Sequence, residues 1–377
     1  MRVIERIIFS ERDSELNIKK TAFYNIHKKY DAKIVEFAGY YMPIQYKGIN
    51  EEHIRVRTTV GVFDVSHMGE FEFIGPKAED FLQLMTTNDV KKLDIYQAHY
   101  SALCYEDGGI VDDLLIYRFP EKFIMVVNAA NLEKDFQWLR ENLIDGVIMK
   151  NRSAEYSLLA IQGKKAEATL QKLTTEDLSQ VKNYWLTEGA LADVPMMIAR
   201  TGYTGEDGFE IMFPTGQSEH VWNAVMNAGA EFDIEPIGLA ARDTLRMEVK
   251  YCLYGNDIDQ MTNPLEAGLG WITKLDKGNF IGRDAIMKIK QAGLGRKLIG
   301  FELEGRAIPR HGYPIFNGNS QIGVVTSGMF SPMLQKPIGL GYVPLNYSEV
   351  GSKITIDIRG RKFPADVVKT PFYNRPY

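Results

Sequence analysis

Two adjacent carboxylates stand out in the segment DGGIVDDLLIY, which runs from Asp107 to Tyr117. Asp112 and Asp113 follow a double glycine and precede an apolar run that favours a strand, although strand interiors are depleted in aspartate. Side chains alternate between the two faces of a strand, so Asp113 shares a face with Tyr117 while Asp112 points the other way. This alternation is compatible with one acid facing a cavity together with Tyr117 and the other being tied up in turn hydrogen bonds. Two solvated turn residues are the alternative interpretation.

A second candidate lies in RTGYTGEDGFEIMF, from Arg200 to Phe213, where a glycine-rich loop around Tyr203 precedes a predicted strand. Alternation in that strand leaves Glu210 and Met212 on the face opposite the aromatic residues. A buried glutamate is costly unless it meets donors, and a planar heterocycle with adjacent N–H and NH₂ groups would satisfy both oxygens. The loop lacks the lysine and glycine spacing of a phosphate-binding loop. A hairpin with a solvated glutamate is the alternative.

Two further segments carry weaker signals. Arg242 and Asp243 are adjacent on a predicted helix; such residues are usually surface charges, but an arginine beside an aromatic pocket can hold the anionic end of a ligand. In VFDVSHMGE, His67 and Met68 precede a strand, and a lone histidine of this kind is more often structural than catalytic. There is no GxSxG motif and no recognisable Cys–His pair, so covalent nucleophilic catalysis has no visible carrier.

The composition is that of an ordinary globular protein. The chain has 377 residues, 45% of them hydrophobic and 25% charged, and its net charge of −5 gives no sign of a nucleic-acid or anionic-membrane partner. Cys104 and Cys252 are too far apart to suggest a disulfide framework or a cysteine zinc site, and the six histidines form no metal-binding spacing. No apolar stretch is long enough for a membrane span. We expect a soluble protein of a reducing compartment, without a metal.

An internal repeat indicates how these residues are positioned. Residues 75–87, GPKAEDFLQLMTT, and residues 163–175, GKKAEATLQKLTT, are identical at eight of thirteen positions, at a constant offset of 88 residues. Each copy follows a short apolar run and spaces its own apolar residues as a helix does. The repeat predicts two related α+β halves, each with a strand–turn–helix unit, and a chance similarity of two amphipathic helices is the alternative.

The rest of the chain changes character near residue 291. Residues 236–251 read as a helix with a proline near its start. After QAGLG, strand-like segments joined by turns such as Asn317-Gly318-Asn319 predict a separate all-β domain, a barrel or a sandwich. We place the domain limits at 1–20 for an N-terminal extension, 21–290 for the two interleaved α+β domains and 291–377 for the β domain.

Taken together and in order, the segments resemble one family, the aminomethyltransferases (T-proteins) of the glycine cleavage system. The resemblance covers about Thr21 to Phe372 and rests on FAGYYMPIQY, VRTTVGVFDVSHMGE, DGGIVDDLLIY, VVNAANLEKD, RTGYTGEDGFE, GLAARDTLRMEVKYCLYG, NPLEAGLGW, FIGRDA and TSGMFSP. It implies an α+β cloverleaf of two related domains and a C-terminal antiparallel β-barrel around a central channel that holds tetrahydrofolate. One departure is Ala240, where the family commonly has glycine.

The resemblance also implies roles for individual residues. Asp113, the second acid of GGIVDD, matches the catalytic aspartate of the family. The positions that match the lining of the folate pocket are Met68, Tyr100, Tyr117, Asn128, Tyr203, Glu210, Arg242 and Tyr251. No position matches a metal ligand.

The activity implied is transfer of an aminomethyl carbon from the lipoyl arm of the carrier (H) protein to tetrahydrofolate, with release of ammonia and formation of 5,10-methylenetetrahydrofolate. The implied partners are the lipoylated H-protein and, functionally, the glycine-decarboxylating and dihydrolipoyl-dehydrogenase components, in the cytoplasm. One alternative is a folate-dependent demethylase of a small methylated substrate. Another is a folate-binding accessory protein of iron–sulfur maintenance, but KYCLYGNDID lacks the Lys-Gly-Cys order and the Gln-Glu of that signature.

Overall fold

The repeated motif folds as a repeated strand–turn–helix unit, as its spacing predicts. In the computed structural model, which describes residues 18–376, β5 (Gly69–Ile74) leads into α4 (Ala78–Met85) and β10 (Tyr156–Gln162) leads into α6 (Ala166–Leu170). Gly75 and Gly163 make the two turns at φ values of +117° and +121°. A Cβ atom added at either glycine would lie 2.4 Å from a backbone carbonyl oxygen. Both turns therefore require glycine.

In the two sheets that contain these strands, equivalent strands follow the same spatial order. The first has the order β6-β7-β8-β5-β9 and the second the order β11-β12-β13-β10-β4-β14. The remaining strands of the first sheet are β6 (Ala98–Cys104), β7 (Ile110–Arg118), β8 (Lys122–Val127) and β9 (Ile148–Asn151). Those of the second are β4 (Gly61–Asp64), β11 (Leu186–Leu191), β12 (Val194–Ala199), β13 (Gly208–Pro214) and β14 (Glu235–Pro236). The prediction of two related α+β halves is confirmed.

The two halves contact each other reciprocally at equivalent residues. The N–H of Ala98 donates to the carbonyl of Tyr184 at 2.7 Å, and the N–H of Leu186 donates to the carbonyl of Tyr96 at 2.9 Å. Tyr96 and Tyr184 are 88 residues apart and both adopt a left-handed backbone, with φ of +67° and +61°. Because each half supplies the same donor and the same acceptor, the pair of contacts is approximately two-fold symmetric.

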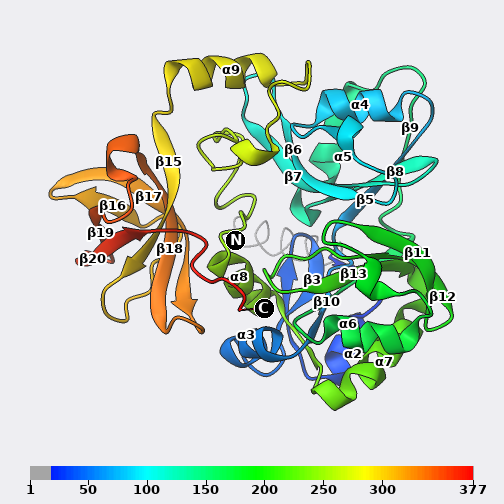
Figure 1. The fold of residues 1–377 in the computed structure, drawn as a ribbon. Coiled ribbons are helices and arrows are strands. Elements are labelled where there is room, and N and C mark those ends of the chain that lie inside the picture. Colours follow the sequence, from blue (N-terminus) through cyan, green and yellow to red (C-terminus); the bar gives the residue numbers. More distant parts are fainter. Residues whose placement is uncertain (1–17, 377) are drawn as a thin grey trace, which may run out of the picture.

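Each half buries its own core against its own helices. In the first, Phe71, Phe73 and Phe81 belong to a cluster beneath α4 and α5 (Leu132–Glu141). In the second, Trp222 and Phe209 belong to a cluster beneath α6 and α7 (Ser218–Gly229). A third cluster contains residues of both sheets and joins the two halves. Figure 1 shows α4 and α5 on the side of one half that faces away from the other half, and α6 and α7 on the corresponding outer side of the second half.

A small N-terminal sheet covers one side of the α+β halves. Its order is β1-β3-β2, formed by β1 (Lys19–Lys20), β2 (Lys33–Phe37) and β3 (Tyr40–Gln45), with α2 (Tyr24–Lys29) between β1 and β2. Residues 1–17 of the predicted N-terminal extension lie outside the described residues, whereas Lys19 and Lys20 pair with β3. The domain limits of the sequence analysis therefore remain proposals.

The central helix α8 (Leu239–Glu248) is shorter than the sequence predicts. Pro236 belongs to β14, which pairs in parallel with β4, and Lys250 adopts a left-handed backbone with φ of +59°. The N–H of Gly238, just before the helix, donates to the buried carboxylate of Glu52 in α3 (Ile49–Thr58) at 2.7 Å. Tertiary contacts thus fix both ends of α8 inside the range that periodicity suggests.

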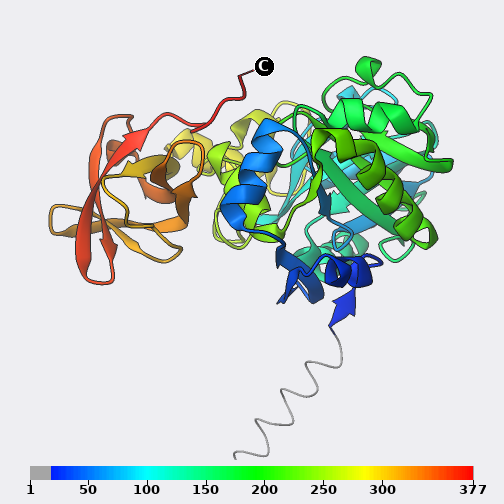
Figure 2. The ribbon, with the colours of Figure 1, turned by 90° about the horizontal axis from the view of Figure 1, so that it is seen from below.

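The C-terminal segment is a closed antiparallel barrel, which settles the choice between barrel and sandwich. Its order is β15-β18-β17-β16-β19-β20. The strands are β15 (Arg296–Leu303), β16 (Pro314–Asn317), β17 (Ser320–Ser331), β18 (Lys336–Pro344), β19 (Lys353–Ile358) and β20 (Arg361–Val368), and α9 (Arg283–Ala292) precedes them. Figure 2 shows the barrel on one side, the α+β halves on the other and the central helices between them.

Buried charges at the end of α8 join the barrel to the α+β halves. Glu248 accepts hydrogen bonds from Arg57 of α3 at 2.9 Å and from Ser331 of the barrel at 2.5 Å. Arg246 forms a 2.6 Å ion pair with Asp257 and donates to Ser327 of the barrel at 2.9 Å. The side chains of both ion pairs are almost fully buried, so neither is screened by solvent.

Replacing Gly163 by alanine should destabilise the protein by roughly 1–3 kcal/mol, because a Cβ atom would clash with the carbonyl of Thr59 at a strained φ. Urea unfolding followed by circular dichroism measures the loss. Gly216→Ala is the matched control, since a Cβ atom there meets nothing within 4 Å. Equal stability of the two variants would contradict this account of the repeated turn.

Candidate active site

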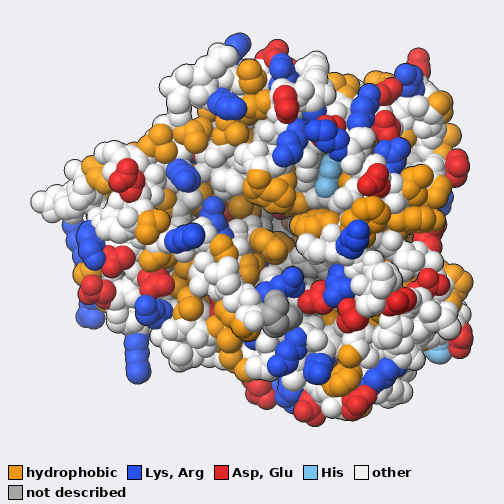
Figure 3. Space-filling view, viewed as in Figure 1, with side chains coloured by type: hydrophobic (Ala, Val, Ile, Leu, Met, Phe, Trp, Pro, Cys, Tyr) orange, Lys and Arg blue, Asp and Glu red, His pale blue; other side chains and the backbone are white. Residues whose placement is uncertain are grey.

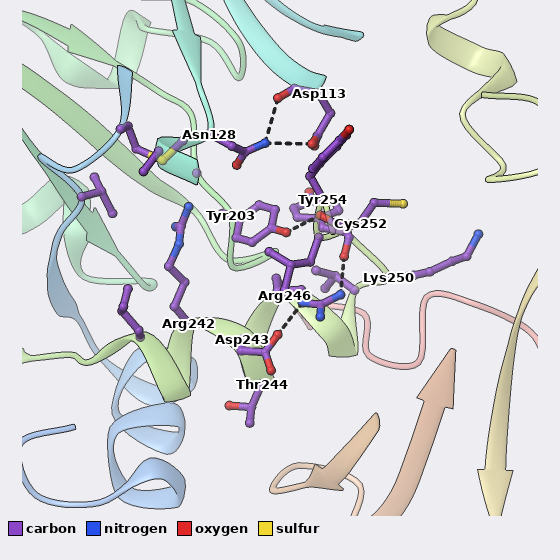
Figure 4. A pocket seen from close by; sticks show the side chains of 18 of the residues that line it. Asp113, Asn128, Tyr203, Arg242, Asp243, Thr244, Arg246, Lys250, Cys252 and Tyr254 are labelled. Carbon is purple, nitrogen blue, oxygen red and sulfur yellow. Dashed lines mark hydrogen bonds and ion pairs between the residues drawn. The ribbon is translucent and has the colours of Figure 1, made fainter. Parts of the chain in front are cut away.

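A cavity of about 990 Å³ lies where the two α+β halves, α8 and the barrel meet. Figure 3 shows a hollow near the centre of the face seen in Figure 1, with hydrophobic side chains around it. Eight of the nine site residues predicted from the sequence line this cavity, and Figure 4 labels four of them. The eight are Met68, Tyr100, Asp113, Asn128, Tyr203, Glu210, Arg242 and Tyr251. Tyr117 is the ninth, and it lies behind the wall.

Asp113 faces the cavity from β7 and is held on both carboxylate oxygens. The hydroxyl of Tyr100 donates to Oδ2 at 2.7 Å, and the amide of Asn128 donates to Oδ1 at 2.9 Å. Burial, followed by the charge of neighbouring Asp112, raises the pKa of Asp113 to about 7. A carboxyl group with this pKa can exchange its proton near neutral pH, which is the property expected of a catalytic group.

Asp112 points away from the cavity into the protein, as the alternation of the strand predicts. Its Oδ2 accepts the backbone N–H of Asn128 at 3.0 Å, and its Oδ1 accepts the side-chain amide of Asn131 at 2.6 Å. Asp112 is fully buried. The interpretation of both acids as solvated turn residues is therefore wrong, because both belong to an interior strand.

Glu210 faces the cavity from β13, while Phe209 and Ile211 pack into the core on the other face. Its Oε2 accepts hydrogen bonds from Thr201 at 2.5 Å and from Tyr117 at 3.4 Å. Its Oε1 accepts none from the residues that the structure describes. Glu210 is only 8% exposed, so the solvated-hairpin interpretation is wrong. The arrangement leaves one oriented carboxylate oxygen for a ligand.

Arg242 brings an unpaired positive charge to the cavity from α8. Among the described residues it has no ion pair, and its guanidinium lies over the ring of Tyr203 at 4.5 Å. Burial lowers the pKa of Arg242 from its ordinary value. The ring of Tyr203 in turn lies 5.8 Å from that of Tyr251, and its hydroxyl donates to the carbonyl of Cys252. An anionic group of a ligand would meet an available cation here.

Asp243 does not share this role with its neighbour. It is half-exposed and forms an ion pair with Arg246 at 2.8 Å, one turn along α8. The sequence analysis did not single out Arg246, which lines the cavity and binds buried Asp257. Its spacing of four residues from Arg242, on the same helix face, was the available signal.

Two other lining residues were missed. Thr201, which orients Glu210, stands inside the glycine-rich motif already noted. Trp271 stands in the quoted segment NPLEAGLGW, is 58% exposed and lies 5.9 Å from the ring of Tyr100. Local periodicity could not predict the contact between Trp271 and Tyr100, because these residues lie in segments far apart in the chain.

His67 also lines the cavity, and its environment is that of a neutral histidine. Burial lowers its pKa to about 4, and its ring packs edge-on against Phe37 at 5.7 Å. The structural interpretation of this histidine is consistent with both observations. Within residues 18–376 no group of three or more His, Cys, Asp or Glu side chains is arranged to hold a metal ion. Over the same range no helix is long and apolar enough to cross a membrane.

The fold defines an α+β protein in which two related halves and a barrel enclose a cavity lined by charged and aromatic side chains. The GCVT N-terminal domain family matches residues 23–277, and the glycine cleavage T-protein C-terminal barrel domain family matches residues 296–374. The chain belongs to this family, that of the glycine cleavage T-proteins.

Individual relatives agree over nearly the whole length. The chain is 50% identical over 356 residues to an aminomethyltransferase of Halothermothrix orenii, covering 94% of this chain and 100% of the relative. It is 52% identical over 361 residues to an aminomethyltransferase of Chloroherpeton thalassium, covering 95% and 99%. A crystal structure of glycine cleavage system aminomethyltransferase T from Bartonella henselae superposes with a TM-score of 0.89 at 35% identity, covering 96% and 99%. The predicted fold class and family are confirmed.

The two cavity arginines should differ sharply in their effect on stability. Arg246→Met leaves Asp257 buried without its partner, so we expect a loss of about 3–5 kcal/mol in the free energy of unfolding. Arg242→Met breaks no ion pair and should change it by less than about 1 kcal/mol. Urea unfolding of both variants beside the wild type makes the comparison. A larger loss for Arg242→Met would mean that the two arginines have been assigned the wrong roles.

Proposed function

We propose that the chain transfers the aminomethyl carbon from the lipoyl arm of a carrier (H) protein to tetrahydrofolate. In this reaction the carbon leaves sulfur and nitrogen and forms bonds to N5 and N10 of the folate, so that ammonia and the dihydrolipoyl arm are released. The observation that carries the proposal is the convergence of Glu210, Arg242 and Asp113 on one cavity. The relatives named aminomethyltransferase support the same reaction.

The residues of the cavity fit a reduced folate. Glu210 would bind the amide–amidine edge of the pterin, with Thr201 and Tyr117 holding its other oxygen in place. Each charge-assisted hydrogen bond to such an edge contributes about 1.5–3 kcal/mol. Tyr117 thus acts through Glu210 and not by lining the pocket. Sequence reasoning placed it on the correct strand face but could not show that another side chain stands in front of it.

The other end of the ligand would lie toward α8. Arg242 is available for an anionic group such as the glutamate carboxylate of a folate, since no described residue pairs with it. Tyr203, Tyr251 and Tyr100 provide aromatic surface in the same cavity. Met68 and Asn128 complete the set of lining residues carried over from the resemblance.

Asp113 would act at the reacting nitrogens. Its carboxylate, held by Tyr100 and Asn128, can orient the nucleophile and stabilise positive charge that develops as the carbon is transferred. Because burial raises its pKa to about 7, the ionised form that does this work becomes populated as the pH rises through neutrality. No metal is required in this scheme.

The proposed partner is the lipoylated H-protein, with a functional link to the glycine-decarboxylating and dihydrolipoyl-dehydrogenase components in the cytoplasm. A volume of about 990 Å³ is at the upper end of single-ligand cavities, which leaves room for the end of a carrier arm beside the folate. No observation in the cavity favours the alternatives of a demethylase or an iron–sulfur accessory protein.

A single-turnover assay tests the reaction and Asp113 together. Tetrahydrofolate and an aminomethyl-loaded lipoyl carrier protein should give stoichiometric ammonia and methylenetetrahydrofolate, at a rate that rises with pH through about 7. Asp113→Asn should slow the reaction by about two to three orders of magnitude and abolish this rise, while the Kd for folate changes less than about threefold. Tight folate binding by the wild type without product would overturn the proposal and direct attention to methyl donors.

Glu210→Ala should chiefly weaken folate binding. Losing the charged acceptor should raise the Kd for tetrahydrofolate at least about tenfold, because the charge-assisted hydrogen bonding to the available oxygen of Glu210 disappears. Isothermal titration calorimetry measures the change. Glu188→Gln serves as the control, since this glutamate lies on β11 outside the cavity lining and its removal should not alter binding. An unchanged Kd in Glu210→Ala would rule out the pterin contact.

A further inference from the structure

At the cavity wall, Asp112 and Asp113 are joined by one amide group, that of Asn128. The Nδ2 of Asn128 lies 2.9 Å from Oδ1 of Asp112 and 2.9 Å from Oδ1 of Asp113. A primary amide has two N–H hydrogens, so it can donate to both carboxyl groups at once. The position of Asp113 in the cavity is therefore coupled to the carboxylate that faces the interior.

Asp112 in turn holds Asn128 from two directions. Its Oδ2 accepts the backbone N–H of Asn128 at 3.0 Å, while Oδ1 accepts the side-chain amides of Asn128 and Asn131. These bonds fix the backbone and the amide plane of Asn128 together. A neutral side chain at position 112 could not accept all of them, so the bridge to Asp113 depends on a carboxylate at Asp112.

A second buried acid stands against Asp112. Asp135 of α5 is fully buried, and both of its carboxyl oxygens lack a donor among the described residues. Its carboxyl group interacts with that of Asp112, and burial followed by the charge of Asp112 raises its pKa well above the ordinary range. Two ionised carboxylates cannot share a dry site, whereas a protonated one can donate to an ionised one.

One cation lies beside the two acids without pairing directly with either. The Nζ of Lys134 donates to the carbonyl of Val111 at 2.6 Å and to the hydroxyl of Tyr254 at 2.9 Å. The titratable groups that face Asp112, Asp113 and Asp135 from the surrounding elements are Tyr100, Tyr105, Lys134, Tyr203, Cys252 and Tyr254. Lys134 alone among these is a cation, so it offsets part of the buried negative charge.

We propose that Asp112 is a positioning residue for Asp113. Protonated Asp135 donates a hydrogen bond to Asp112, and Asp112 itself stays ionised. The Asp112 carboxylate then holds Asn128 and, through Asn128, the cavity-facing carboxylate of Asp113. This inference rests on the function proposed above for Asp113. In this arrangement Asp112 contacts neither substrate nor reacting atoms. It acts by fixing the Asn128 amide and by placing one negative charge next to Asp113.

The charge on Asp112 has a measurable consequence for the reaction. A neighbouring anion disfavours ionisation of Asp113, so removing it should lower the pH at which Asp113 ionises. Asp112→Asn should therefore move the midpoint of the pH–rate profile down by about one unit. It should also slow single turnover about tenfold or more, because the Asn128 bridge is lost, with the folate Kd changed less than about threefold.

Three variants measured side by side test the proposal. Single-turnover rates are recorded across pH for Asp112→Asn, Asp135→Asn and Glu106→Gln, together with the Kd for folate. Asp135→Asn keeps an N–H donor toward Asp112, so its midpoint should stay within about 0.3 units of the wild type. Glu106→Gln removes an exposed charge close to the same strand and should leave the midpoint and the rate unchanged. An unmoved midpoint in a folded Asp112→Asn variant would overturn the positioning role.

Infrared difference spectroscopy tests the shared proton on the protein alone. At pH 8 the spectrum of the wild type minus that of Asp135→Asn should show the carbonyl band of a protonated carboxylic acid. Glu70, a second buried acid without a partner among the described residues, contributes equally to both spectra and cancels. Absence of the difference band would overturn the shared proton, whether or not Asp112→Asn folds. Because no substrate is added, failure of the proposed transfer reaction would be seen separately, as an inactive wild type.

Discussion

The site depends on the buried charges of α8, which tie three parts of the chain together. Glu248 binds Arg57 of α3 and Ser331 of the barrel, and Arg246 binds Asp257 and Ser327. Ion pairs of this kind are costly to desolvate and become favourable only when every partner is in place. The barrel is therefore held in one orientation relative to the α+β halves. That orientation closes the cavity, because α8 also carries Arg242 on its inner face.

An approximately symmetric scaffold produces an asymmetric site. The two halves repeat the same strand order and meet through reciprocal backbone hydrogen bonds. Yet Asp113 comes from the second strand of the order β6-β7-β8-β5 and Glu210 from the third strand of the order β11-β12-β13-β10. Non-equivalent strands supply the two acids, so one half provides the carboxylate proposed for catalysis and the other provides the carboxylate proposed for binding.

The two acids of the cavity differ because their hydrogen bonds and neighbours differ. Asp113 lies beside Asp112, and burial together with that charge raises its pKa to about 7. Glu210 has no acidic neighbour in its hydrogen-bonded shell, only the hydroxyls of Thr201 and Tyr117. The two carboxyl groups therefore have different surroundings in the same cavity.

The sequence by itself determined the features that depend on local periodicity. The 88-residue repeat, the β character of the tail and the opposite directions of Asp112 and Asp113 all follow from spacing along the chain, and spacing also separates Glu210 from the face of Phe209. The motif order was sufficient to find the family. Eight of the nine candidate residues line one cavity, although they come from β6, β7 and β13, from α8 and from loops between elements.

Only the tertiary structure decided which faces meet. It placed Tyr117 behind Glu210 and brought Trp271 against Tyr100. It also limited α8 at its start by β14 and at its end by the left-handed backbone of Lys250. It also brought Asp135 of α5 against Asp112. These contacts join residues up to about 170 positions apart, as Trp271 and Tyr100 show. Periodicity reports which face of an element is buried but not what is buried against it.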